Sequence, residues 1–152
     1  MYKKFMPIAF VSFLFVGCAS VPMANKTVSD SVKQFNLPTQ EKSGIYIYRD
    51  SLFGAALKKD IRVDGKCIGE SAPKVFFFTE VEGGKEHTIS TESEFSPNSI
   101  SLFTKGGDNY FIRQYIKMGA FVGGANLEVV EPAEGKEAVK NLKMAEIGKC
   151  SE

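Results

Sequence analysis

Short runs of apolar, β-branched and aromatic residues alternate with turn-forming residues along the chain from residue 44 onward. Residues 45–48 read Ile-Tyr-Ile-Tyr and residues 75–79 read Val-Phe-Phe-Phe-Thr, so apolar or aromatic side chains fall on both faces. Such segments are typical of central strands that are covered on both sides of a sheet. Residues 87–91 read His-Thr-Ile-Ser-Thr, an alternation that predicts a strand with one buried face.

Further strands are expected at residues 61–64, 67–69, 100–102, 110–118 and 127–130. Asp64-Gly65 separates the first two and predicts a tight hairpin turn, because both positions tolerate positive φ. The segments between strands are too short for crossover helices, which disfavours a parallel sheet. About seven or eight short strands with regular turns predict a mainly β fold, an antiparallel sandwich or barrel, of which we expect the β-sandwich.

Helical spacing occurs in two places. Residues 132–145 open with a proline and then carry apolar residues three or four apart, which predicts one short amphipathic C-terminal helix. The apolar positions are Ala138, Val139, Leu142 and Ala145. Residues 28–35 also carry apolar residues at i, i+4 and i+7, within a polar segment. This second segment fits either a short helix docked on the domain or a solvated spacer.

The beginning of the chain has the pattern of an export signal. Residues 1–4 carry two lysines, and residues 5–16 are almost purely apolar. Twelve residues at about 1.5 Å each do not cross a hydrocarbon layer of about 30 Å as a helix. A basic start, a short apolar stretch and a small residue together are typical of a secretory signal.

Residues 14–20 read Leu-Phe-Val-Gly-Cys-Ala-Ser, which resembles the lipobox of bacterial lipoproteins. In such proteins the cysteine thiol receives a diacylglyceryl group, and the chain is cut just before that cysteine. The resemblance implies a signal peptide over residues 1–17, cleavage between Gly17 and Cys18, and lipidation of Cys18. Residue 19, directly after the cysteine, is alanine and not aspartate. In lipoproteins of this kind that difference implies export to the outer membrane, with the protein facing the periplasm. The alternative is an ordinary secretory signal in which Cys18 falls by chance.

Composition sets limits on the rest. The 152 residues suit one domain, and 43% of them are hydrophobic, enough to bury a core. The 19 basic and 18 acidic residues nearly cancel, so no strong field exists to gather nucleic acid. We expect a signal peptide at 1–17, a lipidated N-terminus and flexible tether at 18–43, and a β-sandwich domain at 44–152.

Two cysteines remain after lipidation. Cys67 and Cys150 would lie in an oxidising compartment, where paired thiols become disulfides. A bridge would pin the C-terminal segment to the hairpin at Asp64-Gly65. The alternative is two free thiols without shared geometry, since sequence does not show their separation.

Candidates for chemistry are few. His87 is the single histidine, and its position in an alternating strand favours a structural role over catalysis. No cysteine or histidine has the spacing of metal ligands. Glu92 and Glu94 could work as an acid–base pair, but a solvated loop explains them as well. We therefore predict no catalytic residue, no metal site and no cofactor.

Two loops carry apolar side chains that could contact a partner or a membrane. Residues 119–125 are rich in glycine and would present Phe121 and Val122. Residues 50–56 would present Phe53 in the same way. The two loops would form one contact surface if they lay at the same end of the sandwich, and the alternative is packing beneath it.

Residues 44–89 combine a strand, the Ile-Arg-Val-Asp-Gly-Lys hairpin, an aromatic strand and the Gly-Gly-Lys turn before His87. This combination resembles small bacterial lipoproteins that carry an uncharacterised domain of unknown function. It is similar, more distantly, to PEGA-type sandwich modules. The resemblance implies a lipid-anchored envelope protein with no established activity.

Three functions fit this sequence. The leading hypothesis is a non-enzymatic structural or interaction module, anchored to a membrane by acyl chains and touching another envelope protein. The second is a periplasmic module that binds a glycan or small ligand. The third is a hydrolase with an unrecognised pair of carboxylates. The oligomeric state stays open.

Overall fold

The computed structural model describes residues 17–151, so the predicted signal segment lies outside the described residues except for Gly17. The elements, in chain order, are α1 (Lys26–Val32), β1 (Lys42–Arg49), β2 (Lys59–Val63), β3 (Lys66–Ser71), β4 (Val75–Glu82), β5 (Lys85–Thr91), β6 (Asn98–Thr104), β7 (Asn109–Lys117), β8 (Gly124–Val130), α2 (Pro132–Lys140) and β9 (Lys143–Met144). The predicted mainly β class is confirmed.

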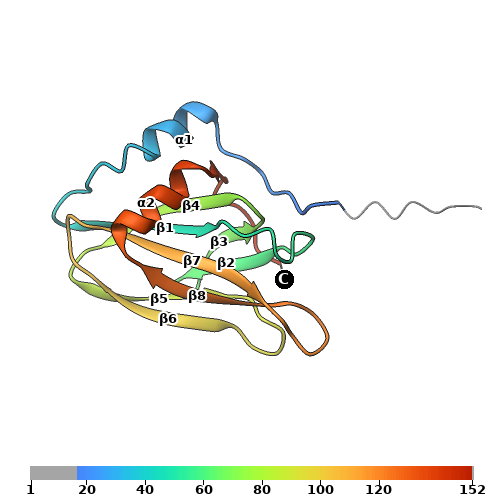
Figure 1. Cartoon of the computed structure of the whole chain (residues 1–152). Helices are drawn as coiled ribbons and strands as arrows, with labels where there is room; N and C mark the ends of the chain where they lie inside the picture. The colour runs from blue at the N-terminus through green and yellow to red at the C-terminus, as the bar shows by residue number, and fades with distance from the viewer. Residues whose placement is uncertain (1–16, 152) are drawn as a thin grey trace, which may run out of the picture.

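The strands form two sheets packed face to face (Figure 1). One sheet has five strands in the order β8-β7-β1-β4-β9, and the other has four in the order β3-β2-β5-β6. The four-stranded sheet is antiparallel throughout, as predicted, with its first hairpin at Asp64-Gly65. The five-stranded sheet differs, because β7 and β1 pair in parallel and so do β9 and β4. The chain crosses to the other sheet for β5 and β6, and this detour brings β7 back parallel to β1.

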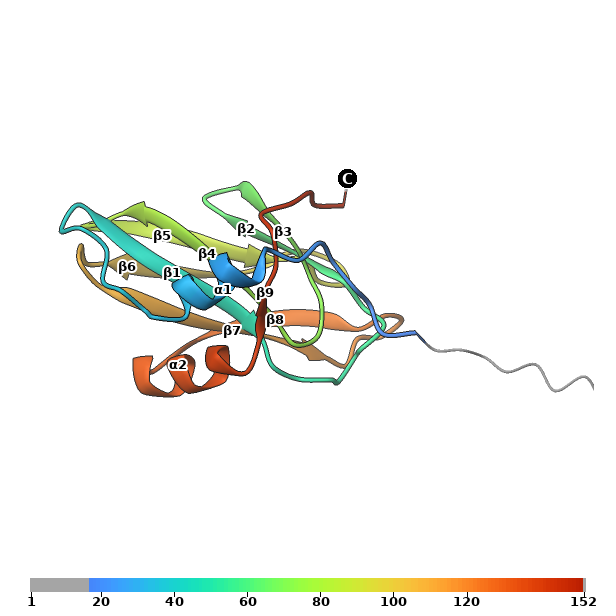
Figure 2. The ribbon, with the colours of Figure 1, turned by 90° about the horizontal axis from the view of Figure 1, so that it is seen from above.

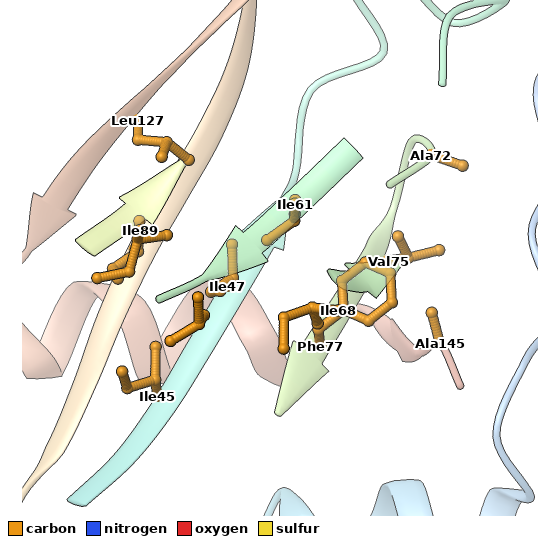
Figure 3. Close-up of a cluster of buried hydrophobic side chains, with 12 residues drawn as sticks. Ile45, Ile47, Ile61, Ile68, Ala72, Val75, Phe77, Ile89, Leu127 and Ala145 are labelled. Atoms are coloured by element: carbon orange, nitrogen blue, oxygen red, sulfur yellow. The ribbon is translucent and has the colours of Figure 1, made fainter. Parts of the chain in front are cut away.

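Strand β1 lies in the middle of the five-stranded sheet and is buried on both faces. Ile45 and Ile47 belong to the core between the sheets, where Figure 3 shows them close to Ile61 and other side chains of the facing sheet. Tyr46 and Tyr48 belong to a second cluster on the opposite face. The side chains of these four residues are at most 1% exposed. The Ile-Tyr-Ile-Tyr pattern thus correctly predicted a doubly covered strand.

The two helices form a third layer on the outer face of the five-stranded sheet (Figure 1, and from above in Figure 2). Val32 of α1 and Val139 of α2 pack there against aromatic side chains of the sheet. The rings of Tyr46 and Phe111 stack beneath them, with centroids 4.8 Å apart. The helices thus cover one sheet of the sandwich, and no helix of residues 17–151 covers the four-stranded sheet.

The polar segment before β1 forms a docked helix. The side-chain oxygen of Asn25 accepts a hydrogen bond from the backbone N–H of Thr27 at 2.8 Å and so caps α1. Val32 and Phe35 pack against the aromatic cluster, whereas Val28 is exposed. Of the two alternatives that the spacing left open, the structure has the docking helix.

Helix α2 ends earlier than the spacing predicted. It stops at Lys140, and Leu142 and Ala145 lie beyond it, although both are buried. Lys143–Met144 form the short strand β9, which pairs with β4. Buried residues on either side of this strand produce the same spacing in the sequence as one more helical turn.

Residues 22–24 run alongside the C-terminal segment, so the N-terminal segment does not stand free of the domain. The backbone N–H of Ala24 donates to the carbonyl of Met144 at 2.9 Å, and the carbonyl of Pro22 accepts from the N–H of Glu146 at 3.0 Å. This differs from the expected tether. The physical reason is that β9 is an edge strand, whose open backbone groups take the N-terminal segment as a partner.

Candidate functional site

Three loops project from one end of the sandwich, and we call their apolar tips the loop-end surface (Figure 1). The loops comprise residues 50–58, 92–97 and 118–123. Six large apolar side chains on them are exposed: Leu52 (60%), Phe53 (53%), Phe95 (78%), Met118 (83%), Phe121 (87%) and Val122 (54%). The structure brings the predicted contact residues Phe53, Phe121 and Val122 to the same end of the molecule. It adds Leu52, Phe95 and Met118, which the sequence pattern did not indicate.

Arg49 at the end of β1 shapes the first of these loops. Its side chain is 0% exposed, and its guanidinium donates to the carbonyls of Leu57 at 2.7 Å, Gly54 at 2.7 Å and Phe53 at 3.2 Å. Burial lowers the pKa of Arg49 below its usual value. Backbone carbonyls thus take the place of water around a buried cation, and they fix the loop that carries Phe53.

Glu94 shapes the loop of residues 118–123. Its carboxylate accepts hydrogen bonds from the backbone N–H groups of Ala120 at 2.6 Å, of Val122 at 3.1 Å and of Phe121. Burial works against the charged form, but these three bonds outweigh it and hold the pKa of Glu94 below its usual value. The rings of Phe95 and Phe121 also meet edge to face, with centroids 6.4 Å apart.

The loops of residues 50–58 and 118–123 are packed closely together. A Cβ atom on Gly123 would come within 2.6 Å of the Leu57 side chain, and one on Gly54 within 2.8 Å of Ile116. Gly54 also has a φ of +67°, which side chains rarely adopt. The loop of residues 118–123 therefore contacts both of the other loops and joins the three into one surface.

Cys18 lies at this end of the molecule. It is exposed and unpaired, and the next residue is already attached to the domain, since the N–H of Ala19 donates to the carbonyl of Ala55 at 2.8 Å. Figures 1 and 2 both show the N-terminal segment leaving beside the loops. The cysteine that the lipobox resemblance singled out is therefore next to the loop-end surface.

The other two cysteines are joined. Cys67 and Cys150 form a disulfide, with Cα atoms 5.9 Å apart. The C-terminal segment lies across β3 and β2, where the N–H of Gly148 donates to the carbonyl of Ile68 at 2.8 Å. Of the two alternatives considered for these thiols, the structure has the bridge.

His87 is a buried structural residue of the four-stranded sheet. Its Nδ1 lies 2.6 Å from a carboxylate oxygen of Asp64, and its Nε2 lies 2.8 Å from the carbonyl oxygen of Glu82. Burial lowers the pKa of His87, but these two acceptors outweigh burial and raise it overall. The Asp64 carboxylate, which also accepts the N–H of Thr88 at 2.9 Å, has a lowered pKa despite its partial desolvation.

This pair makes stability depend on pH. The pKa of His87 is raised in the folded state, so its contribution is complete below the unfolded value of about 6.5 and is lost as pH rises through the folded value. We expect the free energy of unfolding to fall by about 1 kcal/mol across that rise, because Asp64 is half-exposed and solvent screens the pair. Urea unfolding between about pH 5 and about pH 9 measures it. The Asp64→Asn variant should lose most of this dependence, and an unchanged slope would contradict the assignment.

Glu92 and Glu94, which the sequence offered as an acid–base pair, have separate partners. Glu92 lies 3.3 Å from the ammonium of Lys59, while Glu94 holds a loop. A depression of about 320 Å³ is lined by Glu92 and Asp60. There the Asp60 carboxylate accepts hydrogen bonds of 2.9 Å from the N–H and the hydroxyl of Ser151. These acidic side chains therefore take part in contacts that hold the structure together.

A module that binds a glycan would use exposed aromatic rings, but most aromatic rings of the described residues are packed under the helices or between the sheets. The aromatic side chains that are at most 1% exposed are Tyr46, Tyr48, Phe76, Phe77 and Phe111. The largely exposed rings of the described residues are those of the loop-end surface and Phe103. Neither helix between residues 17 and 151 has the length and hydrophobicity that crossing a bilayer requires.

Comparison with known proteins gives a family without an assigned activity. The family described as "Protein of unknown function (DUF2846)" matches residues 39–125. A Haemophilus influenzae protein, named only "Uncharacterized protein", is 56% identical over 135 residues, which are 89% of this chain and 80% of that protein. No solved structure matched. The similarity to PEGA-type modules stays a prediction.

Proposed function

The chain belongs to the DUF2846 family of proteins of unknown function, and within that family we propose that it is a lipid-anchored protein of the cell envelope. The expectation of an uncharacterised domain is confirmed by this membership. In the proposal, residues 1–17 are removed during export and Cys18 carries the acyl chains. The domain then faces the periplasm from the outer membrane.

The observation that carries this proposal is the position of Cys18. It directly follows the apolar run of residues 5–16 and Gly17, and its thiol is exposed and outside the disulfide. Acyl chains contribute about 0.8 kcal/mol for each buried CH₂ group, so that one chain holds marginally and two or three hold firmly. A cysteine at this place would thus be enough to keep the domain on a membrane.

We propose further that the domain is a structural or interaction module and not an enzyme. Three side chains were candidates for catalysis, and each of them makes contacts that stabilise the fold: His87, Glu92 and Glu94. A rigid sandwich on a lipid anchor is suited to holding a fixed surface toward another envelope protein. Pull-down of the acylated protein from an envelope extract tests this part, and no enriched partner would contradict it.

The Cys18→Ser variant of the full chain tests the anchor. The unchanged protein is expected in the membrane fraction, with an intact mass that lacks residues 1–17 and includes acyl groups. The variant is expected to lack both the cleavage and the acyl mass. The Ser20→Ala variant is the matched control, because it changes an exposed residue two positions away and leaves Cys18 and the disulfide in place. Equal masses and fractionation for Cys18→Ser and the unchanged protein would overturn the proposal.

A further inference from the structure

No flexible linker separates Cys18 from the folded domain, because the next residue already contacts it. Ala19 and Val21 pack against the core between the sheets, and the N–H of Ala19 is bonded to Ala55 in the loop of residues 50–58. Neighbouring Cα atoms are about 3.8 Å apart, so a lipid on Cys18 would place the bilayer about one residue from that loop. The attachment therefore fixes which end of the sandwich faces the membrane.

The end that carries Cys18 is also the end that carries the loop-end surface. At the opposite end the turns at Gly83-Gly84 and Lys105–Asp108 present small or charged residues, although Leu37 beside them is 69% exposed. Phe121 and Phe95, by contrast, are 87% and 78% exposed at the anchored end. Exposed apolar tips of this kind mark a surface that contacts something apolar, and aromatic rings favour the boundary between lipid and water.

We propose that the loop-end surface inserts into the lipid bilayer to which Cys18 is anchored, and that it orients the sandwich upright on the membrane. This inference rests on the proposed function, since it takes the acylation of Cys18 as given. Arg49 and Glu94 hold the loops in their folded shape, so the apolar tips need no reordering to insert. Glu94 meets the low-dielectric boundary with its carboxylate already bonded to three N–H groups, which reduces the cost of bringing it there.

The absence of tryptophan from the chain allows a direct test. The Phe121→Trp variant places a single indole at the loop tip, and Phe103→Trp places one on β6. Phe103 is a matched control, because it is 62% exposed and pairs with Glu86 beside the turn at the opposite end. Each full-length variant is purified from membranes in acylated form and reconstituted into vesicles of phosphatidylethanolamine and phosphatidylglycerol, with or without brominated acyl chains.

We expect the emission of Phe121→Trp to shift to the blue and to fall at least about twofold with brominated lipid, as for a ring about 5–10 Å into the boundary of headgroups and chains. The emission of Phe103→Trp should not change. Equal quenching of both variants, or none at residue 121, would overturn the inference. It would also be overturned if the residue 121 signal responded only to added envelope proteins, which would assign the surface to a protein partner.

The same samples separate the two proposals. Intact mass shows whether Cys18 carries acyl groups. If the mass includes acyl groups but the tryptophan at position 121 is not quenched, membrane insertion is contradicted and the proposed acyl anchor on Cys18 is not. A mass without acyl groups would contradict the anchor itself, and the insertion with it.

Discussion

Replacing both Cys67 and Cys150 with Ala is expected to lower the free energy of unfolding by about 4–5 kcal/mol. The disulfide joins residues 83 positions apart, and a crosslink of this span removes many conformations from the unfolded chain. In the folded state the same bridge keeps the C-terminal segment on β2 and β3. A loss of this size is a large part of the stability of an ordinary domain, about 5–15 kcal/mol.

Urea unfolding of the unchanged protein, with and without a thiol reductant, measures the same effect without mutation. The double variant should match the reduced protein and should not respond to the reductant. Lys66→Ala is the control, because it changes an exposed residue next to Cys67 and leaves the bridge intact, and its stability should be close to that of the unchanged protein. A loss below about 1 kcal/mol in the double variant would show that the backbone contacts of Gly148 and Ser151 hold this segment by themselves.

Much of the strand pattern could be predicted because it depends on local chemistry. The two-faced Ile-Tyr-Ile-Tyr run required cover on both sides and has it. Asp64 and Gly65 have φ values of +50° and +76°, the conformation that a two-residue hairpin turn needs. Each of these features depends on residues that are neighbours in the chain, so it can be predicted from the sequence.

The pairing of distant segments could not be predicted in the same way. The parallel contact of β7 with β1 depends on where the chain returns after visiting the other sheet. The place of residues 19–24 depends on a free edge that only the finished sheet creates. The polar composition of these residues predicted a tether. The hydrogen bonds that hold them are made by backbone atoms, so the pattern of side chains does not reveal them.

The loop-end surface was predictable in part. Glycine-rich loops with apolar residues pointed to Phe53, Phe121 and Val122, but nothing in the sequence placed the two loops together. Phe95 was missed because it lies in a short polar stretch between Glu94 and Ser96. A carboxylate that binds three backbone N–H groups of another loop is likewise a feature of the folded state alone.

Replacing Arg49 with Ala is expected to cost about 3–5 kcal/mol of the free energy of unfolding. Three carbonyl oxygens would lose a charged donor, each such bond contributing about 1.5–3 kcal/mol, while release of a buried cation offsets part of that loss. Arg49→Lys should recover little, because one ammonium does not reproduce the planar fork that reaches three carbonyls.

The matched control for this variant is Arg113→Ala. Arg113 is also an arginine of the five-stranded sheet and pairs with β1 in the register, but its side chain and those of its partners Glu128 and Glu134 are all partly exposed. Its replacement should therefore cost at most about 1 kcal/mol. Urea unfolding compares the two variants. Limited proteolysis should cut Arg49→Ala first within residues 50–58, because carbonyls without donors turn toward water and the loop opens.

The loop freed in Arg49→Ala is the one whose Ala55 holds Ala19 beside Cys18. An Arg49→Ala protein that still folds should thus keep its acyl anchor and lose its fixed orientation, so that a tryptophan at position 121 would be quenched less by brominated lipid. Equal stability losses for the two arginine variants, together with an uncut loop, would show that packing between Leu57 and Gly123 is enough to shape this end of the sandwich.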